Sequence, residues 1–123
     1  MSCSVTSDSA CLCLTIHKDT DFTFSITVKK DSVAVDVTGW DVYMDIRAKA
    51  SSTTTLVSIS AVSGIVLTDP LNGVITFTIG RALTDAITEF SGIYDIRYVE
   101  SGDVKILVPP NKVKFIDEIT QVP

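Results

Sequence analysis

Histidine is almost absent from this chain of 123 residues, and its scarcity removes the commonest catalytic base. The one histidine, His17, lies in a segment that alternates like a β-strand, with no acidic residue in register and no nucleophile elbow in the chain. The six glycines are isolated at expected turns, so there is also no glycine-rich phosphate loop. We interpret His17 as a surface or interface residue. The chain is predicted not to be an enzyme and to have no catalytic or cofactor-binding residue.

Cysteine is scarce as well: Cys3, Cys11 and Cys13 are the only three. Together with His17 they supply the residue types of a zinc site. In a strand over residues 11–17, however, Cys13 and His17 would lie about 13 Å apart, whereas zinc holds its ligand atoms about 2.0–2.3 Å from one centre. A Cys11–Cys13 disulfide would need a Cα–Cα distance near its limit of about 6.8 Å. We predict reduced, partly buried thiols and no metal site; zinc binding, or pairing of Cys3 with a neighbouring subunit, are the alternatives.

Long apolar runs and runs of positive charge are missing too. No stretch approaches the roughly 18 apolar residues of a membrane span, and residues 1–10 lack the basic start and apolar core of a secretory signal. The ten lysines and arginines are scattered and the net charge is −5, whereas binding to a phosphate backbone needs clustered cations. We expect a protein that is made and folded in a cytoplasm, with no nucleic-acid or membrane partner.

What the chain has in abundance is alternation of apolar and polar residues. In residues 40–47 every second residue is apolar, and only Tyr43 interrupts the polar positions between them. The same pattern returns in residues 22–28 and 75–79. Side chains of a β-strand point to opposite faces with a period of two, so each segment has one buried face and one solvent face. The pattern predicts antiparallel β-structure.

Short strands separated by turn residues roughly every ten positions predict a β-sandwich or barrel of seven to nine strands. Residues 1–10 are rich in serine and do not alternate, so we expect a flexible N-terminal tail followed by a single domain over residues 11–120. Besides a short apolar segment at 33–35, strands are expected at residues 11–17, 22–28, 40–47, 57–60, 65–67, 74–79, 93–99, 104–108 and 112–116.

Four segments have features of their own. Residues 81–90 break the alternation and place apolar residues at i, i+3, i+4 and i+7, which predicts one short helix or 3₁₀ turn near residues 82–89, with Leu83, Ala86, Ile87 and Phe90 forming its apolar stripe. Residues 65–67 are apolar on both faces, which indicates a central strand. Residues 69–73 predict a turn, and residues 109–111 predict a stiff loop because proline cannot donate a ladder hydrogen bond.

Four aspartates raise the question of calcium, which takes six to eight oxygen ligands. Asp19, Asp21, Asp36 and Asp41 could gather at one end of a sandwich. Aspartate is also common in turns because its side chain bonds the nearby backbone. We favour the turn interpretation and predict no metal site here.

The aromatic residues invite a second question, whether one of them stacks on a sugar. Trp40 is in phase with the apolar residues of its strand, so we place it in the core. Tyr94 and Tyr98 share a face with Ile96 and are also expected mainly in the core.

Five segments resemble, in order, the strands of small immunoglobulin-like domains in tailed-bacteriophage structural proteins. The resemblance spans about residues 14–120, and the family includes the N-terminal domain of baseplate upper proteins. It is carried by residues 16–26 (IHKDTDFTFSI), 36–47 (DVTGWDVYMDIR), 72–79 (NGVITFTI), 91–98 (SGIYDIRY) and 112–120 (KVKFIDEIT).

The resemblance implies an immunoglobulin-like sandwich that serves as a small virion subunit in the tail, collar or baseplate. Its partners would be other virion structural proteins and copies of itself, after synthesis in the host bacterial cytoplasm. The apolar fraction of 46% and the mean hydropathy of +0.36 agree with a surface partly covered by partners. A capsid decoration protein and a module binding host-surface carbohydrate are the alternative functions.

Overall fold

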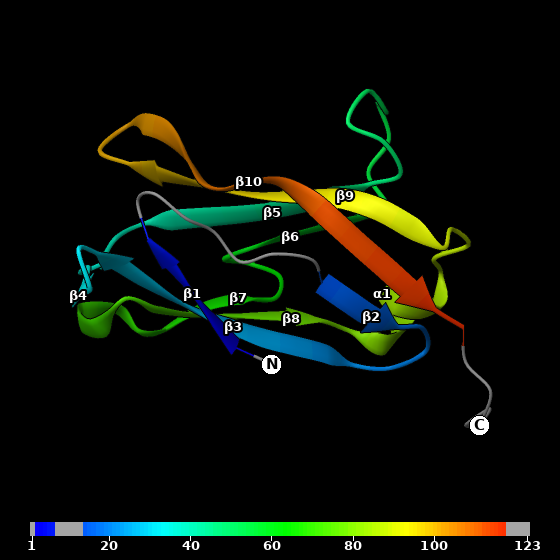
Figure 1. The fold of residues 1–123 in the computed structure, drawn as a ribbon, viewed down its shortest axis with the longest axis horizontal. Coiled ribbons are helices and arrows are strands. Elements are labelled where there is room, and N and C mark those ends of the chain that lie inside the picture. The colour runs from blue at the N-terminus through cyan, green and yellow to red at the C-terminus, as the bar shows by residue number, and fades with distance from the viewer. Residues whose placement is uncertain (1, 7–13, 118–123) are drawn as a thin grey trace.

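A computed structural model describes residues 2–6 and 14–117, and it confirms the predicted all-β sandwich. Two five-stranded sheets face each other (Figure 1). One has the order β1-β3-β8-β7, with β4 paired to β3; the other has the order β2-β10-β9-β5-β6. The strands are β1 Ser2–Thr6, β2 Leu14–His17, β3 Phe22–Lys30, β4 Val33–Ala34, β5 Asp41–Arg47, β6 Val57–Ser60, β7 Ile65–Asp69, β8 Val74–Ile79, β9 Ser91–Glu100 and β10 Asp103–Ile116.

The strand order is that of an immunoglobulin-like sandwich. Strands β3, β8 and β7 take the places of B, E and D, and β10, β9 and β5 take those of G, F and C. Strand β6 extends the second sheet beside β5, as C′ does in variable-type domains. Strand β2 runs parallel to the C-terminal part of β10.

The core forms where the alternating segments face each other. Every second residue of β3, β5 and β8 is buried, as the sequence predicted. Phe24 and Phe77 are register partners on β3 and β8, and their rings stack with centroids 4.8 Å apart. The least exposed large side chains of the core are Leu14, Ile16, Phe24, Ile26, Met44, Ile46, Ile59, Ile75, Phe77, Ile79, Tyr94 and Phe115.

Tight turns join several strands. The β9–β10 hairpin turns at Ser101 and Gly102, which both have positive φ, as a two-residue turn that matches strand twist requires. The predicted turn at residues 69–73 is confirmed as a 3₁₀ turn, η1 (Pro70–Asn72), closed by Gly73 at φ 74°.

The N-terminal region departs from the expected tail. Ser2–Thr6 forms β1, which pairs in parallel with β3, whereas the rest of residues 1–10 lies outside the described part of the chain. The unpaired edge of β3 offers backbone partners to this segment, whose apolar Cys3 and Val5 alternate with polar residues. With β1 and the two-residue β4 the described strands number ten rather than seven to nine, and the division into residues 1–10 and 11–120 stays a prediction.

Two strand assignments need correction. Strand β7 is the edge of its sheet rather than a central strand, and Val66 is 61% exposed. The segments at 104–108 and 112–116 form one strand, β10, whose register with β9 shifts between Ile106 and Val108 and again between Val108 and Asn111. Pro109 and Pro110 fall within the second irregularity, so the strand passes through the expected loop because a bulge tolerates residues without a backbone N–H.

The predicted helix near residues 82–89 is shorter than expected. Helix α1 covers Arg81–Asp85, and of the proposed stripe Leu83, Ala86, Ile87 and Phe90 only Ile87 is buried. The helix is anchored instead by Thr84, which is fully buried. Its hydroxyl accepts a hydrogen bond from the Thr20 backbone N–H at 3.1 Å and lies 2.7 Å from the Thr20 carbonyl, to which it donates. A polar anchor leaves no periodic apolar signal, so the stripe was misleading.

Replacing Thr84 by valine is expected to lower the free energy of unfolding by about 2 kcal/mol, because the Thr20 N–H loses its buried acceptor. Thr84→Ser keeps the hydroxyl and should cost less. Urea denaturation of both variants measures the difference. A stable valine variant together with a destabilised serine variant would show that the methyl group, and not the hydrogen bonds, anchors α1.

The helices in the described part of the chain are a few residues long, and none of them has the length and apolar character needed to span a membrane.

Candidate assembly surface

The solvent side of the β2-β10-β9-β5-β6 sheet carries the candidate site, and we call it the outer face. It is built from the residues of β5, β9 and β10 that alternate with the buried ones. Cross-strand register sets these side chains in rows across the strands. Along the sheet the rows are Arg47, Ile93 and Lys112; Asp45 and Asp95; Tyr43, Arg97 and Ile106; and Asp41, Val99 and Val104.

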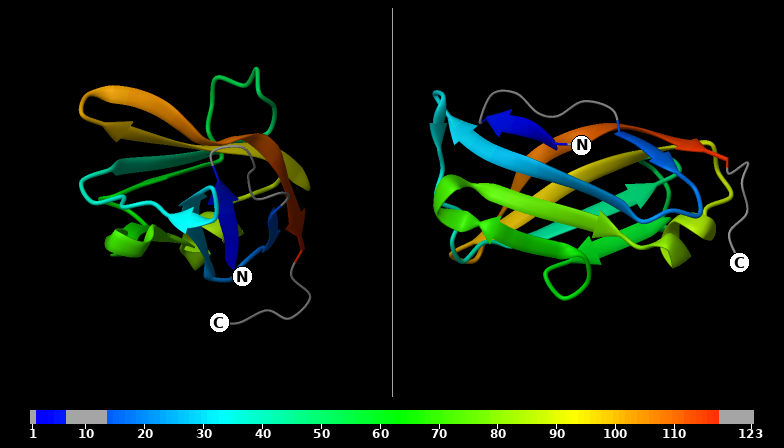
Figure 2. Two further views of the ribbon diagram at one scale, coloured as in Figure 1. Left: turned by 60° about the vertical axis from the view of Figure 1, so that its left-hand side comes forward. Right: turned by 90° about the horizontal axis from the view of Figure 1, so that it is seen from below.

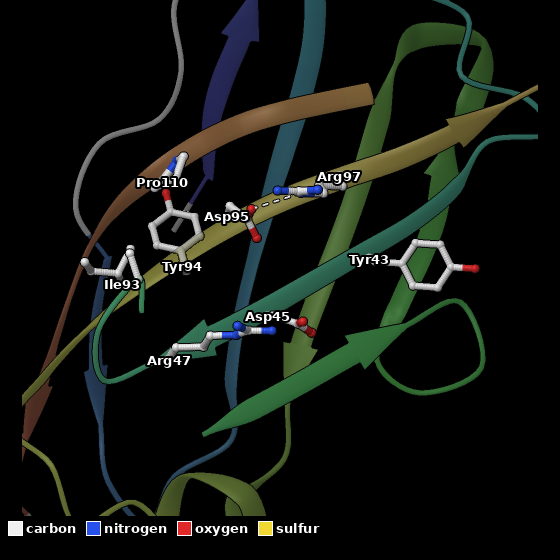
Figure 3. Close-up of a pocket in the computed structure, with 9 residues that line it drawn as sticks. Tyr43, Asp45, Arg47, Ile93, Tyr94, Asp95, Arg97 and Pro110 are labelled. Atoms are coloured by element: carbon white, nitrogen blue, oxygen red, sulfur yellow. Dashed lines mark hydrogen bonds and ion pairs between the residues drawn. The ribbon is translucent and has the colours of Figure 1, made fainter. Parts of the chain in front are cut away.

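A shallow hollow of about 370 Å³ lies in the middle of the outer face (Figure 3). The β5–β6 loop and the β9–β10 hairpin both rise on the outer side of the sheet and flank this region (Figures 1 and 2). The hollow is open to solvent and mixes apolar with charged lining, as a contact surface does. Its lining residues are Tyr43, Asp45, Arg47, Ala50, Ile93, Tyr94, Asp95, Arg97 and Pro110.

The charged groups of the hollow bond to neighbours within the chain. Arg97 Nε lies 3.1 Å from Asp95 Oδ2 (Figure 3). Asp45 accepts a hydrogen bond from the Ser58 hydroxyl at 2.7 Å, and Arg47 donates to the backbone carbonyl of Ser52 at 2.8 Å. These pairs fix the orientation of side chains that would otherwise be mobile, so the face presents a defined pattern of charge.

Tyr43 is the exposed aromatic residue that lines the hollow, with 43% of its surface exposed. Its hydroxyl donates to Asp41 Oδ2 at 2.5 Å, and this hydrogen bond raises the pKa of Tyr43 above its usual value. Sequence analysis treated Tyr43 as an interruption of the polar pattern. Its phase with Asp45 and Arg47 was the available signal that it lies on the solvent side.

The β9–β10 hairpin carries an exposed apolar strip made of Val104 and Ile106, which are 65% and 55% exposed. We call residues 97–106 the hairpin arm. Large apolar side chains side by side on a surface typically mark a contact with another molecule.

The inner side of the hairpin arm is fastened to the core. Tyr98 stacks on Trp40 with ring centroids 3.9 Å apart and an interplanar angle of 9°. Glu100 accepts hydrogen bonds from Trp40 Nε1 at 2.8 Å and from Lys105 Nζ at 3.3 Å. The bond and charge of Glu100 raise the pKa of Lys105, so this lysine is firmly cationic at neutral pH. The arm therefore has a fixed orientation, with its apolar strip outward.

The opposite end of the outer face is aromatic and basic. Phe90 is 67% exposed and lies beside Lys112 and Lys114 along a second, open hollow. Lys18 Nζ lies 4.7 Å from the centroid of the Phe90 ring and 3.0 Å from Asp117 Oδ1. The outer face thus runs from a basic, aromatic end to an apolar end.

The residues considered for zinc are only partly described. His17 is exposed at the end of β2, and its backbone carbonyl accepts a hydrogen bond from the Thr20 hydroxyl at 2.6 Å. Cys11 and Cys13 lie outside the described residues, and for Cys3 only the backbone is described. Reduced thiols without a metal therefore stay a prediction.

The four aspartates considered for calcium do not meet. Asp19 pairs with Arg81 and Asp21 accepts from the Arg81 backbone N–H, at the start of β3. Asp36 lies near Val28 of this nine-residue strand, because the neighbouring Val35 N–H donates to the Val28 carbonyl; Val28 is about 23 Å from Asp21 at ~3.3 Å per residue. Asp41 begins β5 in the opposite sheet, and no three possible metal ligands cluster within the described residues. Asp36 accepts from the Thr38 hydroxyl and backbone N–H, which lower the pKa of Asp36. Of the four, Asp36 makes the local turn bonds that the favoured interpretation expected, whereas Asp19 and Asp21 bond Arg81 far along the chain and Asp41 accepts from the Tyr43 hydroxyl.

The aromatic residues assigned to the core are confirmed there. Trp40 is 9% exposed and Tyr94 is fully buried. Tyr98 is half-buried, packed between the core and the hairpin arm. The stacking of Trp40 on Tyr98 leaves no free indole face for a sugar on that side.

Comparison with known proteins gives one kind of match. No protein-family model matches the sequence, and no curated protein matches it. Among solved structures, the chain is similar to one described as "N-terminal domain of phage TP901-1 ORF48", with a TM-score of 0.51 and 10% sequence identity. The similarity covers 96% of this chain and 99% of that chain.

The fold resembles that of a bacteriophage protein domain. At 10% identity this likeness concerns the fold alone. It confirms the architecture that the resemblance in sequence implied, over nearly the full length of both chains.

The exposed strip on β10 was missed by sequence analysis. Val104, Ile106 and Val108 share one phase, which predicts a single buried face. The register shift after Ile106 inserts an extra residue, so Val108 is buried whereas Val104 and Ile106 point outward. The two prolines that follow were the one signal of irregular pairing.

Proposed function

We propose that the protein is a non-enzymatic structural subunit of a bacteriophage particle that works by assembly with other virion proteins. The observation that carries the proposal is the outer face, where exposed apolar side chains lie among charges held by internal pairs. The likeness in fold to a phage protein domain, along almost all of both chains, supports the bacteriophage setting.

The proposed place of the protein is the tail, collar or baseplate, with a decorating position on the capsid as the variant. It would be made in the host bacterial cytoplasm and end in the virion. Its partners would be other virion structural proteins and further copies of the chain. Both ends of the outer face suit such contacts, because aromatic and aliphatic side chains contribute most of the energy at protein interfaces.

The non-enzymatic part of the proposal is supported by the chemistry of the hollow. A catalytic site needs a nucleophile and base in contact, or convergent groups aimed at a reacting atom. The charged residues of the hollow are instead held by neighbours, Asp95 by Arg97, Asp45 by the Ser58 hydroxyl and Arg47 by the Ser52 carbonyl. The one histidine is on β2 rather than in the lining.

Carbohydrate binding is the second candidate, and one observation favours it. The half-exposed ring of Tyr43 stands beside the planar polar groups of Arg97 and Asp45, an arrangement that can stack on and hydrogen-bond a sugar. A rise in melting temperature with host-surface glycans would support this candidate, because ligand binding to the native state stabilises it.

Mass spectrometry of purified particles tests the main proposal. The chain is expected in virions at a fixed ratio to the tail proteins, and tail-less particles should separate a tail position from a capsid position. A Tyr43→Asp variant should enter particles less well, because it places a third carboxylate beside Asp41 and Asp45. Val62→Asp, at an exposed loop position in the same chain, is the matched control. Absence of the protein from particles that form in its presence would contradict the proposal.

A further inference from the structure

The hairpin arm has a second property besides its apolar strip, an open backbone edge. Strand β10 pairs with β9 from Asp103 onward, but β2 pairs with β10 only from Val113 to Ile116. Within the described part of the chain, no strand lies on the other side of β10 between Asp103 and Ile106. Edges of this kind pair with other chains unless they are blunted.

The hairpin geometry determines which backbone groups this edge presents. Glu100 and Asp103 flank a two-residue turn, so they exchange both of their hydrogen bonds. Pairing alternates along an antiparallel ladder, so Val104 and Ile106 turn their N–H and C=O groups away from β9. The residues with the exposed side chains are therefore also those with the outward backbone groups.

The usual protection of an edge begins only beyond this point. The bulge follows Ile106, and Pro109 and Pro110 come after it in β10. Strand β2 covers the edge of β10 only from Val113 onward. Lys105 is the one charged side chain between Val104 and Ile106, and it is turned to the inner side and engaged by Glu100. Among the described residues nothing pairs with the outer edge of β10 before the bulge, so this segment can accept a strand.

We propose that the hairpin arm pairs with the hairpin arm of a second copy of this chain, as antiparallel β10 edges related by a two-fold axis. This inference rests on the proposed function and names the surface by which copies would associate. In the matching register Val104 lies opposite Ile106 of the second copy, and Ile106 lies opposite Val104. Each such pair exchanges both backbone hydrogen bonds and sets two exposed apolar side chains against each other.

The charged side chains of the hairpin arm are compatible with the same register. Lys105 lies on the two-fold axis facing its own counterpart, which by itself is unfavourable. Each Lys105 is already paired with Glu100 of its own chain at 3.3 Å, and it is diagonal to Asp103 of the opposite strand. The like charges are therefore flanked by carboxylates on both sides. A shift of the second copy by two residues would set its turn residue Gly102 opposite Ile106. One of the two residue pairs that exchange backbone hydrogen bonds would then be lost, so the register is specified.

Sedimentation equilibrium of the purified chain over a range of concentrations tests the proposal. The wild-type chain is expected to dimerise. Ile106→Pro removes an outward N–H that β9 does not use, so it should abolish the dimer while the fold persists. Val104→Lys should weaken the dimer roughly tenfold or more, because each copy then sets a charge against an apolar residue. Circular dichroism checks that the variants are folded.

A paired substitution separates contact from structure. The double variant Val104→Lys with Ile106→Glu places opposite charges across both register pairs, and it should recover much of the affinity that Val104→Lys loses. Val66→Lys, at a comparably exposed position on the edge strand β7, should leave the dimer unchanged.

The other outcomes count against the proposal in different ways. A chain that is monomeric at every concentration overturns the pairing of copies, whether or not it is found in particles. If that monomer enters particles and Ile106→Pro does not, the edge takes a strand of a different virion protein and the proposed function stands. A dimer that survives Ile106→Pro, or is lost with Val66→Lys, shows that another surface holds the copies together.

Discussion

Phe77→Ala is expected to lower the free energy of unfolding by about 4 kcal/mol, the largest effect of any substitution considered for this chain. Phe77 is fully buried on β8, where its ring stacks on that of Phe24 at 4.8 Å with an interplanar angle of 7°. Removing the ring leaves a cavity between the sheets that the surrounding strands fill only in part. Guanidinium denaturation of the purified variant measures the loss.

The same substitution at an exposed phenylalanine is the control. Phe90→Ala removes a ring that is 67% exposed and touches the core little, so its cost should stay below about 1 kcal/mol, mainly from lost contact with Lys18. Similar losses in the two variants would mean that the interior between β3 and β8 is not tightly packed, contrary to the stacked geometry.

Gly73→Ala is expected to destabilise the protein by about 3 kcal/mol. Gly73 closes η1 at φ 74°, a conformation that costs any other residue energy. A Cβ atom there would also lie 2.6 Å from the Val28 carbonyl oxygen and 2.7 Å from that of Val35. Both neighbours are backbone atoms of the adjoining strand region, so they cannot move aside cheaply. A thermal melt followed by circular dichroism detects the change.

Two other glycines separate the strain of a positive φ from the close contact of an added Cβ atom. Gly102 has φ 85° but open space around it. Gly102→Ala should therefore cost only the strain of a positive φ in a non-glycine residue, about 1 kcal/mol. Gly80 has neither positive φ nor a neighbour within 4 Å, so Gly80→Ala should be nearly neutral. If Gly73→Ala cost no more than Gly102→Ala, the close approach of the Val28 and Val35 carbonyls would not be a determinant of stability.

The fold was predictable because apolar and polar residues alternate clearly along most of its strands. Residues 74–79 form β8 as predicted, and β5 begins one residue later than predicted. Local pattern does not show where a strand lies within its sheet: residues 65–67 of β7 are apolar on both faces, and the strand still forms an edge. Helix α1 shows the same limit, since its anchor is the hydroxyl of Thr84 bonded to Thr20, 64 residues apart.

The candidate surface was less accessible to sequence analysis. Its charged rows follow from strand phase, but their meeting across β5 and β9 depends on a register that no local signal sets. The outward turn of Val104 and Ile106 follows from one inserted residue in β10. The alternation that identified the strand therefore does not show that these two side chains point to solvent.

The stacking of Trp40 on Tyr98 gives the protein a built-in optical probe. Trp40 is the only tryptophan, and its indole N–H is bonded to Glu100, at the turn end of β9. Emission of this single fluorophore therefore responds to the environment at the root of the hairpin, without a dye or an engineered label. A change in its wavelength or lifetime during particle maturation would time the moment at which that region changes its surroundings.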